Sequence, residues 1–252
     1  MKLSNFTKTA GAGVVFALVI LAGMLITSTS GRGQGNNSGA VDEQLMITQG
    51  YAIAPVTLNL SGKDHDLVGL GSYLVNAVAD CNGCHNSSPQ DNEFTATGNP
   101  YLLTQQLGGP FTGVKQVNPA TYLAGGQNFG TFDPGGQSAP IITRNLTPDY
   151  AGSPEGGHSL NDFVQIMRTG IDLDGIHPTC TGALNQGCVP FPFNGQLLQI
   201  MPWPSFQSMT DRQLQAIFEY LSAIPCIDNS TSTPPPGFPD QLRNNCGGGR
   251  TR

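Results

Sequence analysis

The chain has 252 residues, of which only 11% are charged, and it contains 33 glycines and 19 prolines. Its net charge of −6 offers no excess of cations for a phosphate backbone, so we expect no nucleic-acid partner. The composition is typical of one domain with extensions and long, uncharged polar loops.

The first element is an apolar run, "GAGVVFALVILAGMLIT" at residues 11–27, which follows Lys2 and Lys8 and precedes small residues. This pattern predicts a signal peptide that is cleaved near residues 28–30. The alternative is an uncleaved membrane anchor, although a full span needs about 20 apolar residues. We therefore interpret residues 1–30 as a signal peptide or N-terminal anchor. Either interpretation places the protein in the periplasm or elsewhere outside the cytoplasm, and an anchor would associate it with the membrane.

Residues 31–62 have the composition of a polar linker followed by an extended arm. A helix is predicted over residues 67–79, because Leu67, Leu70 and Leu74 recur at helical spacing. This helix leads directly into the sequence "CNGCH" at residues 81–85.

Within that sequence, Cys81 and Cys84 are followed at once by His85. A C-x-x-C pair alone would fit a disulfide, a redox pair or half of a zinc site. The histidine changes the interpretation, because C-x-x-C-H is the attachment signature of covalent haem. Two thioether bonds would hold one edge of the porphyrin, and the next imidazole would lie beneath the iron. The sequence therefore predicts one haem c, attached at Cys81 and Cys84 with His85 on the iron.

The region between His85 and residue 149 contains Gly-Gly turns and short apolar runs, and we expect loops with little β-structure there. A second helix is predicted over residues 161–169, with Met167 on its apolar face and hence in the core. The histidines His65, His158 and His177 lie outside helical patterns. We interpret them as surface residues.

Met201 differs from the other methionines, because it lies in "QIMPWPSF" between Ile200 and Pro202. The prolines of this stretch prevent a regular helix and fix the direction of the backbone. A thioether on such a loop is suited to haem iron, so we predict Met201 as the sixth ligand with Trp203 beside the cofactor. The alternative is that Met201 fills a gap near Trp203.

The last helix is predicted over residues 211–223. Thr210 is a favourable N-cap and Gln213 completes a capping box. Met209 and Leu214 then stand at the positions of a hydrophobic staple, which gives Met209 a structural role.

Four further cysteines remain, an even number that suits two disulfides in an oxidising compartment. Three connectivities are open, and pairing of nearest neighbours is the simplest of them. It joins Cys180 to Cys188 and Cys226 to Cys246. The second bridge would tie down a Pro- and Gly-rich C-terminal tail, which we place at residues 229–252.

The order of these features resembles the class I cytochrome c family. A helix precedes C-x-x-C-H, a middle helix ends in "MRTG", and "MPWPSF" leads into a last helix with "YLSAIP". The chain looks most similar to the monohaem cytochrome c domains of alcohol dehydrogenase cytochrome subunits and to related periplasmic electron carriers. The resemblance covers about residues 66–225 and implies an all-α cytochrome c fold over residues 63–228. In that fold at least three helices would surround the haem.

The resemblance also implies roles for single residues. His85 would be the proximal iron ligand and Met201 the distal one, whereas Gly71 and Tyr73 would pack against the last helix near Tyr220. With both axial positions filled, no substrate reaches the iron, so we expect a single-electron carrier rather than an enzyme. Its contacts with redox protein partners would be small and transient. The alternatives are a haem subunit of a dehydrogenase complex, or a haem enzyme or sensor with a displaceable sixth ligand.

Overall fold

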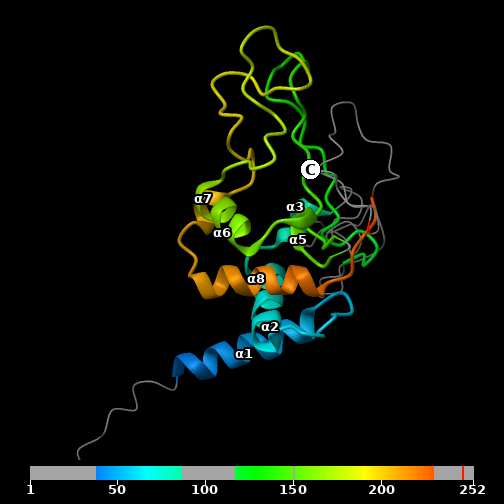
Figure 1. Ribbon diagram of the computed structural model, residues 1–252, viewed down its shortest axis with the longest axis vertical. Helices are drawn as coiled ribbons and strands as arrows, with labels where there is room; N and C mark the ends of the chain where they lie inside the picture. Colours follow the sequence, from blue (N-terminus) through cyan, green and yellow to red (C-terminus); the bar gives the residue numbers. More distant parts are fainter. Residues whose placement is uncertain (1–37, 87–116, 150, 230–245, 247–252) are drawn as a thin grey trace, which may run out of the picture. The chain divides into compact units, whose positions relative to one another are not determined.

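The computed structural model describes residues 38–86, 117–149, 151–229 and 246 (Figure 1). Regular structure in these ranges is helical, which confirms the all-α prediction at that level. β-pairing in the described ranges is limited to three isolated bridges. The predicted signal peptide or anchor at residues 1–30 and most of the predicted tail lie outside the described residues. The helices are α1 (Ser38–Ile53), α2 (His65–Tyr73), the π-helix η1 (Leu74–Val78), α3 (Cys81–His85), α5 (Pro154–Gly157), α6 (Leu160–Thr169), α7 (Trp203–Phe206) and α8 (Asp211–Ala223).

Helix α1 corrects the prediction of a linker and extended arm over residues 31–62. It carries no regular apolar stripe, since Val41 and Leu45 are exposed while Ile47 and Gly50 are buried. Its contact with α2 depends on a close backbone approach. A Cβ atom on Gly50 would lie 1.9 Å from the carbonyl oxygen of Gly69. A pattern of small residues at a helix crossing is not visible as amphipathic periodicity, and the sequence prediction therefore missed this helix.

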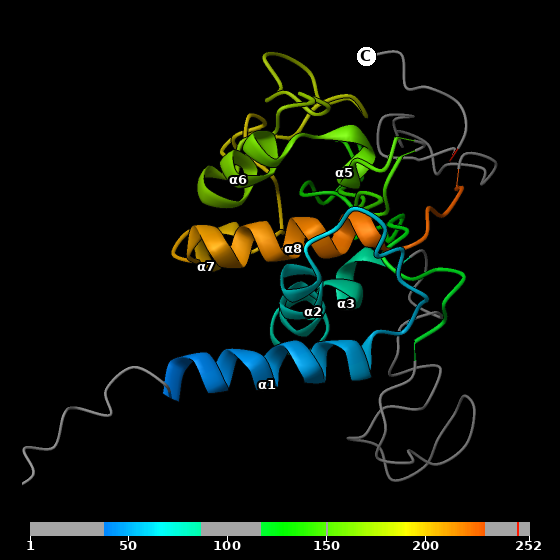
Figure 2. The ribbon, with the colours of Figure 1, turned by 60° about the horizontal axis from the view of Figure 1, so that its bottom comes forward.

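Helix α2 lies between α1 and α8 (Figure 2). Gly71 makes the contact with α8, because a Cβ atom there would be 1.9 Å from the Ala216 carbonyl oxygen and 2.7 Å from the Tyr220 Cβ. The expected packing of Gly71 against the last helix is thus confirmed, whereas that of Tyr73 stays a prediction. Leu70, Leu214 and Leu221 are buried in the core around this crossing.

The helix predicted over residues 67–79 is divided into α2 and η1. Asp64 caps its start by accepting a hydrogen bond from the Leu67 amide at 3.1 Å. The hydrogen-bond register widens at Leu74, whose carbonyl accepts from the Ala79 amide at 2.8 Å. A π-turn of this kind inserts one residue into the helix and rotates the chain beyond it. It therefore changes the direction in which the chain enters α3.

Helix α8 begins and ends where the sequence predicted. The capping box is confirmed: the Thr210 hydroxyl accepts from the Gln213 amide at 3.2 Å, and the Gln213 side chain accepts from the Thr210 amide at 2.9 Å. Helix α6 begins one residue before the prediction, at a capping box made by Ser159 and Asp162. The predicted place of Met167 in the core is also confirmed, since only 6% of it is exposed.

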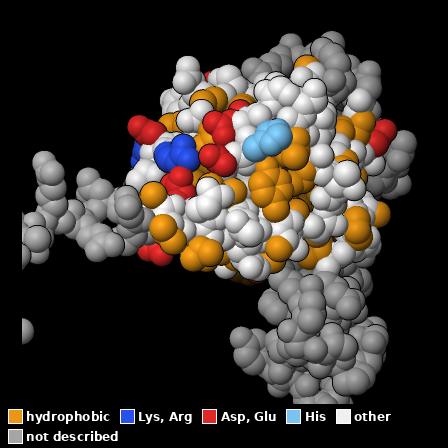
Figure 3. Space-filling model, turned by 90° about the horizontal axis from the view of Figure 1, so that it is seen from below, with side chains coloured by type: hydrophobic (Ala, Val, Ile, Leu, Met, Phe, Trp, Pro, Cys, Tyr) orange, Lys and Arg blue, Asp and Glu red, His pale blue; other side chains and the backbone are white. Residues whose placement is uncertain are grey.

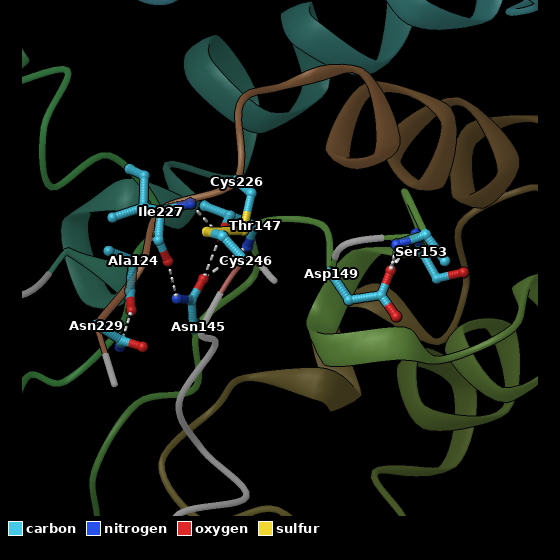
Figure 4. Close-up of a disulfide and its surroundings, with 10 residues drawn as sticks. Ala124, Asn145, Thr147, Asp149, Ser153, Cys226, Ile227, Asn229 and Cys246 are labelled. Atoms are coloured by element: carbon cyan, nitrogen blue, oxygen red, sulfur yellow. Dashed lines mark hydrogen bonds between the residues drawn. A yellow bond between two sulfur atoms is a disulfide. The ribbon is translucent and has the colours of Figure 1, made fainter. Parts of the chain in front are cut away.

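Two disulfides of the structure confirm the nearest-neighbour pairing, Cys180 with Cys188 and Cys226 with Cys246. The second bridge lies just beyond α8, where the chain is held against a loop by hydrogen bonds (Figure 4). Asn145 donates to the Ile227 carbonyl at 3.0 Å, and the Ile227 amide donates to the Thr147 hydroxyl at 3.1 Å.

The prediction that His158 lies at the surface is wrong. His158 was expected to be exposed in a turn, but only 4% of it is exposed, and its ring lies near Asp162 and Asp174. The surface is otherwise poor in charge, as the composition requires. On the face seen in Figure 3, charged side chains are few and lie mostly to one side of a histidine, and several hydrophobic side chains lie together beside that histidine. No helix of the described ranges is both long and apolar enough to cross a bilayer.

Candidate functional site

A cavity lies between α3, α6, α8 and the loops that precede α7. The empty space between its walls is about 1330 Å³, a figure that includes solvent at its mouth. Most of its walls are apolar, and they include Leu146, Phe163, Leu198, Ile217 and Leu221.

Helix α3 brings Cys81, Cys84 and His85 together at this cavity. Asp80 turns the chain into α3 with a left-handed backbone, φ 48°, and a Cβ atom on Gly83 would lie 2.8 Å from an Asp80 carboxylate oxygen. The two cysteines stand one helical turn apart, and the structure does not join them in a disulfide. Partial burial, with Asp80 close by, raises the pKa of the Cys84 thiol.

The ring of His85 is oriented by a backbone group. Its Nδ1 is 2.9 Å from the Arg144 carbonyl oxygen, which can only accept, so Nδ1 carries the proton and donates. Burial lowers the pKa of His85 and keeps the ring neutral. The remaining nitrogen, Nε2, then has the lone pair that a metal ion needs. Metal-binding histidines commonly show this arrangement, with the second nitrogen fixed by a carbonyl or carboxylate.

Arg144 is a functional candidate that the sequence analysis missed. Its side chain is 10% exposed, lines the cavity and is paired with Asp172 and with Asp174, the latter at 2.9 Å. The sequence holds a clue, because Arg144 is the single charged residue between Asp133 and Asp149. An isolated cation in a stretch of apolar and small residues often has a buried partner.

Met201 also lines the cavity, and its role as an iron ligand stays a prediction. The backbone around it is tightly turned. Ile200 has φ 66°, a left-handed conformation that is rare for a β-branched residue and costs on the order of 1–3 kcal/mol. The Met201 amide donates to the Gln199 carbonyl at 2.7 Å, and the Trp203 amide donates to the Met201 carbonyl at 2.8 Å. The thioether therefore comes from a constrained segment. Met167 of α6 lines the same cavity, so two thioethers border it.

Trp203, expected beside the cofactor, is not among the cavity-lining residues of the described chain. Its ring packs instead on Gly170, where a Cβ atom would lie 2.3 Å from the indole. Gly170 ends α6 in the left-handed conformation, φ 68°. Trp203 thus joins α7 to the end of α6 and supports the segment that carries Met201.

His177 was expected at the surface, and the structure corrects this in part, because the residue is half-buried. Both of its ring nitrogens are buried without a hydrogen-bond partner in the described part of the chain, and the residue lines the cavity. Burial lowers the pKa of His177, whereas nearby Asp172 acts in the opposite direction. The prediction failed because "DGIHP" has the composition of an exposed turn, while the loop from Gly170 to Met201 folds over the cavity.

No family model matches the chain, and no curated protein is significantly similar to it. Among the described residues, no group of three or more His, Cys, Asp or Glu side chains is arranged to hold a metal ion by itself. The cavity therefore has to be interpreted from its own chemistry. It combines two thiols, a neutral imidazole oriented by a carbonyl, and thioethers in an apolar enclosure.

Proposed function

We propose that the protein is a c-type cytochrome that carries single electrons outside the cytoplasm. In this proposal one haem is bound covalently through Cys81 and Cys84, with His85 and Met201 as axial ligands of its iron. The observation that carries the proposal is the hydrogen bond from His85 Nδ1 to the Arg144 carbonyl. It leaves Nε2 to bind iron in the same cavity that Cys81, Cys84 and Met201 line.

Two other interpretations of the C-x-x-C pair are less well supported. A redox-active or nucleophilic cysteine works as a thiolate and is marked by a lowered pKa, but burial and Asp80 raise the pKa of Cys84. A structural zinc site needs four ligands, and the described residues offer no such group around Cys81 and Cys84. Thioether formation, in contrast, uses both sulfurs and needs the adjacent histidine.

The residues around the cavity suit an electron carrier. Bound haem iron supplies the one-electron chemistry by alternating between the ferrous and ferric states. Apolar side chains such as Phe163 and Leu198 exclude water, and water exclusion lowers the polarity around the site. Arg144 fixes His85 from one side, and the turn at Ile200 restrains Met201. Such fixed ligands need little rearrangement when an electron is gained or lost.

The resemblance to class I cytochromes c and the two disulfides support export to an oxidising compartment. Contacts with redox protein partners would then be small and transient.

Covalent haem is the test of this proposal. The full chain is expressed in a host that attaches haem c, purified and extracted with acidified acetone, which removes haem that is not covalently bound. Mass spectrometry is expected to find one haem retained on the peptide that contains Cys81 and Cys84. The matched control is a Cys81→Ala, Cys84→Ala double variant, which should lose its haem to the solvent. Complete extraction of haem from the parent protein contradicts the proposal.

A further inference from the structure

The cavity has one polar side in otherwise apolar walls. Arg144, Asp172 and His177 lie together there, and electrostatic effects of Arg144 and Asp172 on His177 show that the three are neighbours. The backbone carbonyl of Arg144 contacts the ring of His85, while its guanidinium extends to Asp172 and Asp174.

His177 is the residue of this polar side whose ring nitrogens make no well-formed hydrogen bond, although Asp172 and the backbone of Ile176 lie near the ring. The Arg144 guanidinium is already engaged by two carboxylates, but both His177 ring nitrogens are buried without a hydrogen bond in the described chain. Leaving a buried polar group unsatisfied costs about 1–3 kcal/mol. A ligand group that reaches this imidazole would satisfy it.

The position of His177 is fixed by the loop around it. A Cβ atom on Gly195 would lie 2.2 Å from the His177 carbonyl oxygen, so the two backbone segments are in direct contact. Two residues further on, the Thr179 hydroxyl accepts from the Gly195 amide at 2.8 Å, and Cys180 is bridged to Cys188. The ring is therefore held at the cavity wall by the surrounding structure.

Haem is a flat apolar ring with two carboxylates at one edge, and its iron lies at the centre. We propose that His177 donates a hydrogen bond to one of these edge carboxylates and is not a ligand of the iron. This inference rests on the proposed function and adds a cofactor-binding residue to it. The polar side of the cavity receives the acidic edge of the ring, and the apolar walls receive the rest. A carboxylate that accepts this hydrogen bond places less negative charge near the iron, which favours the ferrous state.

The test uses the haem-loaded full chain, in which covalent attachment has first been established by mass spectrometry. His177→Ala removes the donor, His177→Gln keeps an N–H donor, and His158→Gln is the matched control at a buried histidine outside the cavity lining. Each variant is titrated between its ferrous and ferric states with optical spectra. The vibrations of the edge carboxylates are recorded by resonance Raman spectroscopy.

We expect His177→Ala to shift the ferrous–ferric equilibrium three- to ten-fold toward the ferric state, where a ten-fold shift is about 59 mV. The carboxylate vibration should shift with it, while the axial-ligand bands stay those of the parent. His177→Gln should lie closer to the parent than His177→Ala, and His158→Gln should match the parent.

Loss of the parent's axial-ligand bands in His177→Ala would identify His177 as an iron ligand and overturn the inference. An equal shift in the alanine and glutamine variants, or no shift in either, would also overturn it. Absence of covalent haem from the parent is a different outcome, because it refutes the proposed function itself.

Discussion

Met201 owes its position to the residue before it. A left-handed backbone at Ile200 is unfavourable for a β-branched side chain, so the surrounding contacts must maintain it. Leu198 supplies one of them, because its amide donates to the Gly170 carbonyl at 2.7 Å at the end of α6. Strain of this kind is commonly found where a side chain has to be held in one place.

In the proposed cytochrome, the distal iron ligand can be identified by substitution. Met201→Ala is expected to open the sixth position of the iron to water or small added ligands, which changes the spectrum from low spin to high spin. Met201→His is expected to lower the reduction potential by on the order of a few tenths of a volt, within the ~0.8 V range that axial ligands control. Imidazole stabilises ferric iron more than a thioether does, which sets the direction of this change.

Met167→Leu is the control, because Met167 also borders the cavity but belongs to the core of α6. It should leave the spectrum and potential nearly unchanged. The assignment of Met201 is wrong if Met201→Ala keeps the parent's low-spin spectrum while Met167→Leu loses it.

Among single residues, the sequence predicted those that belong to a short, recognisable motif. Cys81, Cys84 and His85 form a contiguous motif, and the prolines after Met201 mark its loop. Arg144 and His177 have no such signature, since their importance depends on which loop folds over the cavity. Burial of a loop residue is decided by tertiary packing, and local composition carries little information about it.

Among the elements, α2 depends most on glycine, because both of its crossings need close backbone contact. Gly69 faces α1, where a Cβ atom would lie 2.7 Å from side-chain atoms of Ile47 and Tyr51. Gly71 faces α8, and there the obstacle is the Ala216 carbonyl oxygen, which cannot rotate away. Of these two glycines of α2, Gly71 is therefore the less tolerant of substitution.

Gly71→Ala is expected to lower the free energy of unfolding by at least about 2 kcal/mol, because α2 and α8 must separate to admit the methyl group. Chemical denaturation followed by circular dichroism measures it. Gly39→Ala is the control, since Gly39 lies in α1 with no atom within 4 Å of the added Cβ. That variant should be neutral or up to about 1 kcal/mol more stable. Equal stability of the two variants would contradict the described α2–α8 contact.

The elements differ in how far their sequences define them. Residues 211–223 carry both a capping box and an apolar face, so α8 was predicted at its observed bounds. The π-helix η1 was not predicted, because one widened hydrogen-bond turn leaves the apolar spacing around Leu74 almost unchanged. Helix α1 was missed because it packs through Gly50 and carries no regular apolar stripe that a sequence prediction could recognise.

At the scale of the whole molecule, the bridge from Cys226 to Cys246 joins the end of the helical core to the last part of the chain. The two cysteines are 20 positions apart. Closing a loop of this length restricts the unfolded chain and contributes about 3 kcal/mol in the entropic model. The hydrogen bonds of Asn145 and Thr147 to Ile227 hold the same region in the folded state.

A Cys226→Ser, Cys246→Ser double variant is therefore expected to lose about 3 kcal/mol, which lowers Tm by roughly 6–12 °C for a domain of this size. Calorimetry on the haem-loaded protein measures the change. The optical spectrum should stay that of the parent, because neither cysteine lines the cavity. An unchanged Tm would contradict the expected contribution of this bridge to stability.

The six cysteines also have a consequence for biosynthesis. Four of them are oxidised in pairs, whereas in the proposed cytochrome Cys81 and Cys84 would have to stay reduced until each sulfur had reacted with a haem vinyl group. Both kinds of chemistry would occur in the same compartment on the same newly exported chain. Thiol oxidases and the haem-attachment machinery thus compete for Cys81 and Cys84 before folding is complete. For the proposed cytochrome, the yield of mature protein in a recombinant host would therefore depend on the outcome of that competition.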